Sequence, residues 1–179
     1  MITRRQLGVR MLLGASAALL AGCGFRPVYA PNADGTAGAG AQGLAQIRVA
    51  LIKDRSGQLL RQDLQQRFDG TGAGAAKLYE LSVAYNVGQE GVAIQQTDSV
   101  ATRTRVVASA TWSLFSMDTQ RRTVTSGRAR TIDGFNPLDG QFFYTELQYE
   151  QALHRVSETV ADQIALELGV YFNQHPTGN

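Results

Sequence analysis

The sequence predicts an α+β fold in which two helices pack on one face of a four-stranded, mainly antiparallel sheet, preceded by a flexible segment. Two segments, Gly57 to Phe68 and Thr145 to Phe172, place apolar residues at three- and four-residue steps, as amphipathic helices do. Segments between them alternate apolar with polar residues, which is typical of half-buried antiparallel strands. Packing both helical stripes on one sheet face is the economical way to bury them.

The first 22 residues have the three-part build of an export signal. Arg4, Arg5 and Arg10 form a positive start, and Met11 to Leu20 form an apolar run too short to span a bilayer comfortably. We expect residues 1–22 to be removed. Thr3 to Leu7 also resembles a twin-arginine signal, so both this export route and the general secretory route stay open.

Cys23 ends the sequence Leu20-Ala21-Gly22-Cys23, which resembles the lipobox of bacterial lipoproteins. Such a match implies a diacylglyceryl group on the Cys23 sulfur, cleavage before this residue and acylation of the new amino group. The alternative is an incidental cysteine. Since it is the only cysteine, a disulfide framework or a thiolate metal site is excluded. Gly24, which is not Asp, favours the outer membrane by resemblance to sorted lipoproteins.

Residues 23–45 are predicted to form the lipidated tether, because Ala30 to Gln46 is rich in small and polar residues. Within it, Gly38 to Gly43 matches G-x-G-x-x-G, but it precedes a predicted strand and opens no helix. A dinucleotide site is therefore not expected there. A second glycine cluster, Gly70 to Gly74, lacks P-loop spacing and indicates a connection.

Residues 46–179 are predicted to form a single α+β domain. It begins with a short strand, Ile47 to Leu51, and the helix with Leu60, Leu64 and Phe68 on one face. The next strand runs from Leu78 to Val87. The residues on its predicted core face are Tyr79, Leu81, Val83, Tyr85 and Val87. The long last helix follows punctuation at Asn136-Pro137 and Gly140 and has the apolar stripe Tyr149, Leu153, Val156, Val160, Ile164 and Leu168.

A long hairpin, Thr102 to Met117 and Arg122 to Ile132, supplies the third and fourth strands around the turn Asp118 to Arg121. The core face of the third strand is Val106, Ala108, Ala110, Trp112 and Leu114; its other face is Arg103, Arg105, Ser109, Thr111 and Ser113. With a loop of Thr119-Gln120, Arg128 faces Thr111 and Arg130 faces Ser109. Four arginines then share the non-core face, whereas a one-residue change in the turn would move two of them away.

Charge and residue inventory argue against nucleic-acid binding and catalysis. The formal charge of +2 includes three signal arginines, so the mature chain is near 2 − 3 = −1. The basic pI of the precursor therefore gives no reason to expect a nucleic-acid partner. His154 and His175 lack a triad setting, and no metal-binding spacing occurs, so no metal or cofactor is expected. Asp98, Asp133 and Asp139 could in principle act as paired catalytic carboxylates, but carboxylates in loops are usually turn formers.

The chain resembles the LptE family of lipopolysaccharide-assembly lipoproteins, whose mature terminus reads Cys-Gly-Phe-Arg-Pro, an apolar residue and Tyr. The matching residues are Cys23 to Tyr29. Element order agrees as well, through the hairpin sequence Arg103 to Ala110 and the passage Gly127 to Leu138 before the last helix.

The resemblance implies a non-enzymatic plug that sits in the barrel of LptD, supports its assembly and contacts lipopolysaccharide on its way to the outer leaflet. It implies a heterodimer with LptD and a lipid anchor on the periplasmic side of the outer membrane. We expect Arg103, Arg105, Arg128 and Arg130 to contact lipopolysaccharide or LptD, because guanidinium forks hold phosphate oxygens in pairs. Ordinary solvated arginines that blunt sheet aggregation remain the alternative. An auxiliary subunit of another envelope transport system is the second candidate function.

Overall fold

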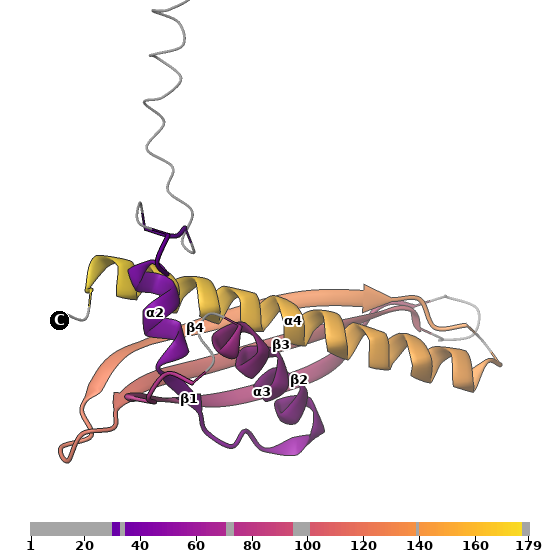
Figure 1. The fold of residues 1–179 in the computed structure, drawn as a ribbon. Coiled ribbons are helices and arrows are strands. Elements are labelled where there is room, and N and C mark those ends of the chain that lie inside the picture. Colours follow the sequence, from indigo (N-terminus) through magenta and orange to yellow (C-terminus); the bar gives the residue numbers. More distant parts are fainter. Residues whose placement is uncertain (1–29, 33–34, 71–73, 95–100, 139, 177–179) are drawn as a thin grey trace, which may run out of the picture.

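The computed structural model of this protein describes residues 30–32, 35–70, 74–94, 101–138 and 140–176. In chain order its helices and strands are α2 (Ala39–Ala45), β1 (Ile47–Val49), α3 (Asp54–Asp69), β2 (Tyr79–Ile94), β3 (Ala101–Ser116), β4 (Thr123–Phe135) and α4 (Phe142–Gln174). The elements form one sheet with helices along it (Figure 1).

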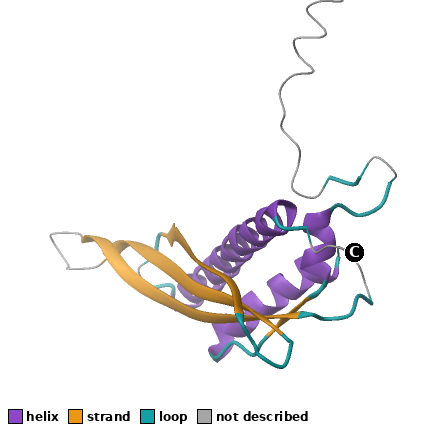
Figure 2. Cartoon of the chain, turned by 90° about the vertical axis from the view of Figure 1, so that its left-hand side faces the viewer, coloured by secondary structure: helices purple, strands orange, loops and turns teal. Residues whose placement is uncertain are grey.

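The sheet has the order β1-β2-β3-β4. β1 runs parallel to β2, as the α3 crossover requires, while β2, β3 and β4 are antiparallel neighbours. α3 contacts β1 and β2, and α4 contacts β3 and β4. Figure 2 shows the helices on one face of the curved sheet, with the other face uncovered. The predicted α+β fold is confirmed.

The core lies between this face and the two long helices. All five residues predicted for the core face of β3 are buried, and α4 packs its predicted apolar stripe against them. From β2, Leu81 and Val83 are buried, while Tyr79, Tyr85 and Val87 pack partly buried at the margin. The alternation of apolar side chains therefore predicted the buried face correctly.

α2 is a third helix that the sequence did not predict. All of it lies in the segment Ala30 to Gln46 that was predicted to be flexible, and that prediction is wrong from Ala39 onward. Leu44 and Ala45 are buried, and α2 packs against α4 and α3. The backbone N–H of Gly40 donates a hydrogen bond of 2.9 Å to Oδ1 of Asn173 at the end of α4. Small residues form this helix because they let it approach α4 closely, a tertiary contact that composition does not reveal.

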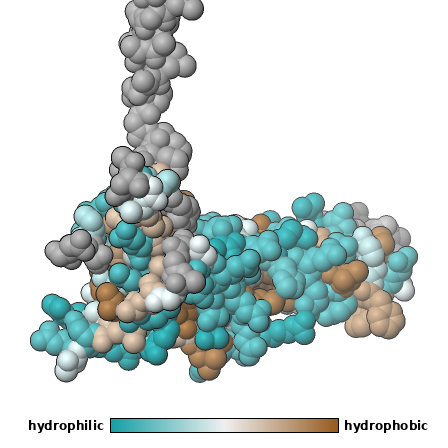
Figure 3. All heavy atoms as spheres, in the orientation of Figure 1, coloured by the Kyte–Doolittle hydropathy of each residue, from teal (hydrophilic) through white to brown (hydrophobic). Residues whose placement is uncertain are grey.

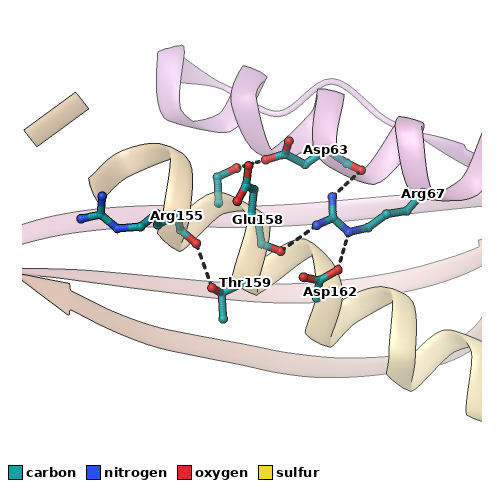
Figure 4. Close-up of polar contacts among 7 residues, drawn as sticks. Asp63, Arg67, Arg155, Glu158, Thr159 and Asp162 are labelled. Atoms are coloured by element: carbon teal, nitrogen blue, oxygen red, sulfur yellow. Dashed lines mark hydrogen bonds and ion pairs between the residues drawn. The ribbon is translucent and has the colours of Figure 1, made fainter. Parts of the chain in front are cut away.

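Polar contacts join α3 to α4 on the outer side of the helical layer (Figure 4). The Arg67 guanidinium on α3 donates to the Asp162 carboxylate at 2.6 Å and to the carbonyl oxygen of Glu158 at 3.2 Å. The hydroxyl of buried Ser157 donates to Asp63 at 2.6 Å. These bonds fix how the two helices lie along each other.

Several elements differ in length from their predicted ranges. β2 continues to Ile94 because β3 pairs with it along nearly its whole length, although the last residues lack apolar alternation. α4 begins at Phe142. β1 has three residues, so its pairing with β2 ends at Leu81.

Candidate partner-binding face of the sheet

The uncovered face of the sheet brings the predicted arginines to the same side. β3 and β4 pair Thr111 with Arg128 and Ser109 with Arg130, the register predicted from a two-residue turn. Near the tip, however, Phe115 pairs with Thr123, so Val124 is an extra, unpaired residue that forms a bulge in β4. The loop is longer than predicted, and in it the Arg121 N–H donates to the Asp118 carbonyl oxygen at 3.1 Å. The bulge compensates for the longer loop and restores the predicted register. Arg128 and Arg130 are therefore on the non-core face, as predicted.

The four arginines form two pairs along this face. Arg105 lies opposite Gly134, whereas Arg130 lies opposite Ser109, four positions along β3. At about 3.3 Å per residue, the nearest members of the two pairs, Arg105 and Arg130, are about 13 Å apart along the strands. We call Arg103 and Arg105 the distal pair and Arg128 and Arg130 the central pair. The two pairs therefore occupy different stretches of the face.

The distal pair lines a hollow of about 460 Å³ together with Val92, Ile132, Asp133 and Gly134. The Arg103 guanidinium lies over Gly134, where a Cβ atom would stand 3.4 Å from Nε. Arg105 is 3.8 Å from the Glu90 carboxylate, a weak and exposed ion pair. Val92 and Ile132 expose nearly half of their surface here. The hollow thus offers cations beside apolar side chains.

The central pair lies in polar surroundings. Arg128 and Arg130 are exposed, and within the described part of the chain neither has a hydrogen-bond or ion-pair partner. Their cross-strand neighbours Ser109 and Thr111 are exposed too. Both guanidinium groups are therefore available to a ligand or partner without breaking an existing bond.

The arginines at the hairpin tip have structural contacts instead. Arg121 donates to Glu80 on β2 at 2.6 Å, and its guanidinium lies 5.2 Å from the ring centroid of Phe115. Glu80 also pairs with Arg48 of β1. No pattern in the sequence predicts this contact, because it joins residues from three separate strands and the turn.

A groove of about 530 Å³ lies along the edge of β2, where the short β1 leaves it unpaired. Leu51, which is 78% exposed, and Tyr85 line it. Burial, with a smaller contribution from the charge of Asp63, raises the pKa of Tyr85 to about 12. The sequence did not predict this groove, since it depends on where β1 ends.

The remaining candidate residues are dispersed. Cys23, Asp98 and Asp139 lie outside the described residues. Asp133 accepts a hydrogen bond from Arg155 at 2.6 Å, His154 is exposed on α4, and His175 stacks on Tyr171. In the described ranges there is no group of three metal-binding side chains, and none of the helices there is long and apolar enough to cross a membrane.

Comparisons with known proteins agree with this architecture. The model of a family described as "LptE: Lipopolysaccharide-assembly" matches residues 44–168. No curated protein sequence matches the chain.

Solved structures share the fold at low sequence identity. A candidate lipoprotein from Caulobacter crescentus CB15 is 21% identical, with a TM-score of 0.60 over 74% of this chain and 95% of the other. Rare lipoprotein B from Shewanella oneidensis is 8% identical, with a TM-score of 0.52 over 70% and 95% of the two chains. A minor lipoprotein from Acinetobacter baumannii is 13% identical, with a TM-score of 0.51 over 71% and 92%.

Proposed function

The chain belongs to the LptE lipopolysaccharide-assembly family, and on this basis we propose that it is a lipoprotein of the outer membrane that plugs and supports an LptD barrel. In this role it helps to assemble lipopolysaccharide into the outer leaflet. It acts by binding and has no catalytic role. The observation that carries the proposal is the uncovered, arginine-bearing face of an otherwise well-packed sheet.

Acylated Cys23 holds the protein on the periplasmic side of the outer membrane. Two or three acyl chains, at about 0.8 kcal/mol per buried CH₂, make such an attachment permanent in practice. The described body begins beside the end of α4, where α2 packs. The anchor therefore joins the chain at that end of the long axis.

The uncovered face suits a polar barrel lumen. Transmembrane barrels turn apolar residues to lipid and polar residues inward. Ser109, Thr111 and the central pair present hydroxyl and guanidinium groups that can bond to such a wall. We assign the central pair to the LptD contact.

The distal pair suits lipopolysaccharide. Planar guanidinium groups bind phosphate oxygens in pairs, and Val92 and Ile132 supply apolar contact beside them. We assign this hollow to the phosphorylated end of the glycolipid. The separation of about 13 Å between the pairs lets one protein hold the barrel and the lipid at once.

Charge reversal tests both assignments. Arg128→Glu with Arg130→Glu is expected to reduce LptD co-purification, and Arg103→Glu with Arg105→Glu is expected to reduce lipid A pull-down. A matched control, Arg55→Glu with Arg122→Glu, reverses two exposed cations outside the two arginine pairs. Unchanged binding in both assays would remove the arginine hypothesis. Co-purification with an inner-membrane permease instead of a barrel would favour an auxiliary subunit of another transport system.

A further inference from the structure

The start of α4 exposes an unusual group of apolar side chains, which we call the aromatic tip. It consists of Phe142, Phe143, Tyr144 and Leu147, with exposed fractions of 76%, 89%, 41% and 55%. The first buried residue of α4 is Ala152. The tip therefore extends beyond the core, and Figure 3 shows hydrophobic atoms gathered at the end of the molecule away from α2.

The apolar residues of the tip form one broad face, which spans about 200° of the helix circumference. Successive residues of an α-helix are about 100° apart, so Phe143, Leu147 and Tyr144 lie within an arc of about 100°. Phe142 extends this face, and its ring meets that of Phe143 edge-on, with 6.1 Å between the centroids. An amphipathic helix packed on one protein surface has an apolar stripe about 100° wide, and the face of the tip is about twice as broad. A fluid apolar medium covers all sides at once.

The charges of the tip distinguish between lipid ligands. From Phe142 to Gln148 the single charged residue is Glu146, and no cation is present. A glycolipid with several phosphates would be repelled by this carboxylate, whereas a bilayer surface of largely zwitterionic phospholipid would not. Gln141 makes no side-chain cap, so the first N–H groups of α4 are free to bond to interfacial water and lipid carbonyls.

We propose that the aromatic tip inserts into the polar–apolar interface of a phospholipid bilayer. α4 has 33 residues and is about 50 Å long. α2 packs near its other end, through the bond from Gly40 to Asn173. The tip is therefore a second membrane contact, far from the anchor, and the free lipoprotein lies with its long axis along the membrane. This inference is independent of LptD and lipopolysaccharide.

A tryptophan reporter tests the contact in the acylated full-length protein. Phe143→Trp places an indole in the tip, and Leu166→Trp places one at a half-exposed position farther along the same helix. In vesicles of phosphatidylethanolamine with a minor share of phosphatidylglycerol, we expect bromine-labelled lipid to quench the added indole at 143 and not the one at 166, with buried Trp112 as the same background in both variants. Equal quenching at both positions, or none at 143, would overturn the proposal.

A flotation assay separates the tip from the anchor. A chain expressed without residues 1–23, which has neither signal nor anchor, is expected to float with the same vesicles. In this chain, Phe142→Ser with Phe143→Ser is expected to reduce the bound fraction about tenfold. Leu51→Ser with Leu166→Ser removes two exposed leucines elsewhere and should leave it unchanged. Binding that survives loss of the rings, or that requires lipopolysaccharide in the vesicles, would contradict the inference.

Discussion

Gly43 on α2 lies directly against the ring of Phe172 on α4. A Cβ atom at Gly43 would stand 2.2 Å from Cγ of Phe172 and 2.5 Å from Cδ2, closer than real side-chain contacts allow. Phe172 is buried and cannot withdraw freely. The glycine-rich segment that resembles a nucleotide-binding motif therefore serves close helix packing.

Substituting Gly43→Ala is expected to destabilise the fold. Overpacking costs about 1–3 kcal/mol, and the better helix propensity of alanine recovers about 1 kcal/mol. We therefore expect a net loss of up to about 2 kcal/mol in urea unfolding, with faster hydrogen exchange at the Gly40 amide. Gly88→Ala is the control, since a Cβ there meets nothing within 4 Å. Equal stability of the two variants would show that α2 does not pack as described.

Removing the Ser157 hydroxyl is expected to weaken the contact between α3 and α4. Ser157→Ala deletes the bond to Asp63 from a buried position and should cost about 1 kcal/mol, since Asp63 is only partly buried and water can replace the donor. Thr159→Ala removes an exposed hydroxyl that bonds within α4. If thermal unfolding affected both variants equally, the bond between the helices would have no specific effect.

The raised pKa of Tyr85 predicts a loss of stability in alkaline solution. Folding keeps this phenol protonated, so its contribution is complete below about pH 10 and is lost as the pH rises toward about 12. Tyr85→Phe removes the titration and a hydroxyl with no partner among the described residues. The free energy of unfolding of the variant should therefore rise relative to that of the wild type between pH 9 and pH 11. Since the side chain is partly exposed, we expect this rise to be no more than about 1 kcal/mol.

Urea unfolding of wild type and Tyr85→Phe at both pH values measures this difference. Tyr144→Phe, which removes an exposed hydroxyl, is the matched control and should follow the wild type. A pH-independent gap between wild type and Tyr85→Phe would contradict the assignment.

The sequence predicted the fold where periodicity is strong. Alternation along Val106 to Leu114 and the stripe from Tyr149 to Leu168 identified the core, and the hairpin register placed Arg128 and Arg130 correctly. The register held although the turn differed, because the bulge at Val124 cancels the one-residue offset at the turn. The predicted register was therefore correct, although it was derived from a two-residue turn that the structure does not have.

The features that sequence reasoning missed depend on tertiary contacts. α2 is too short and glycine-rich to form by propensity alone and is stabilised by Phe172 and Asn173. The groove at the β2 edge exists because β1 ends early. The hollow at the distal pair needs Val92, which comes from beyond the predicted end of β2.

Depletion of the protein in cells tests the central proposal most directly, with surface lipopolysaccharide as the measured quantity. We expect lipopolysaccharide at the cell surface to fall and lipopolysaccharide to accumulate in the inner layers of the envelope. Expression of the wild-type chain should restore surface lipopolysaccharide. A chain with glutamate at positions 103, 105, 128 and 130 should not restore it. Undiminished surface lipopolysaccharide after complete depletion would contradict the account.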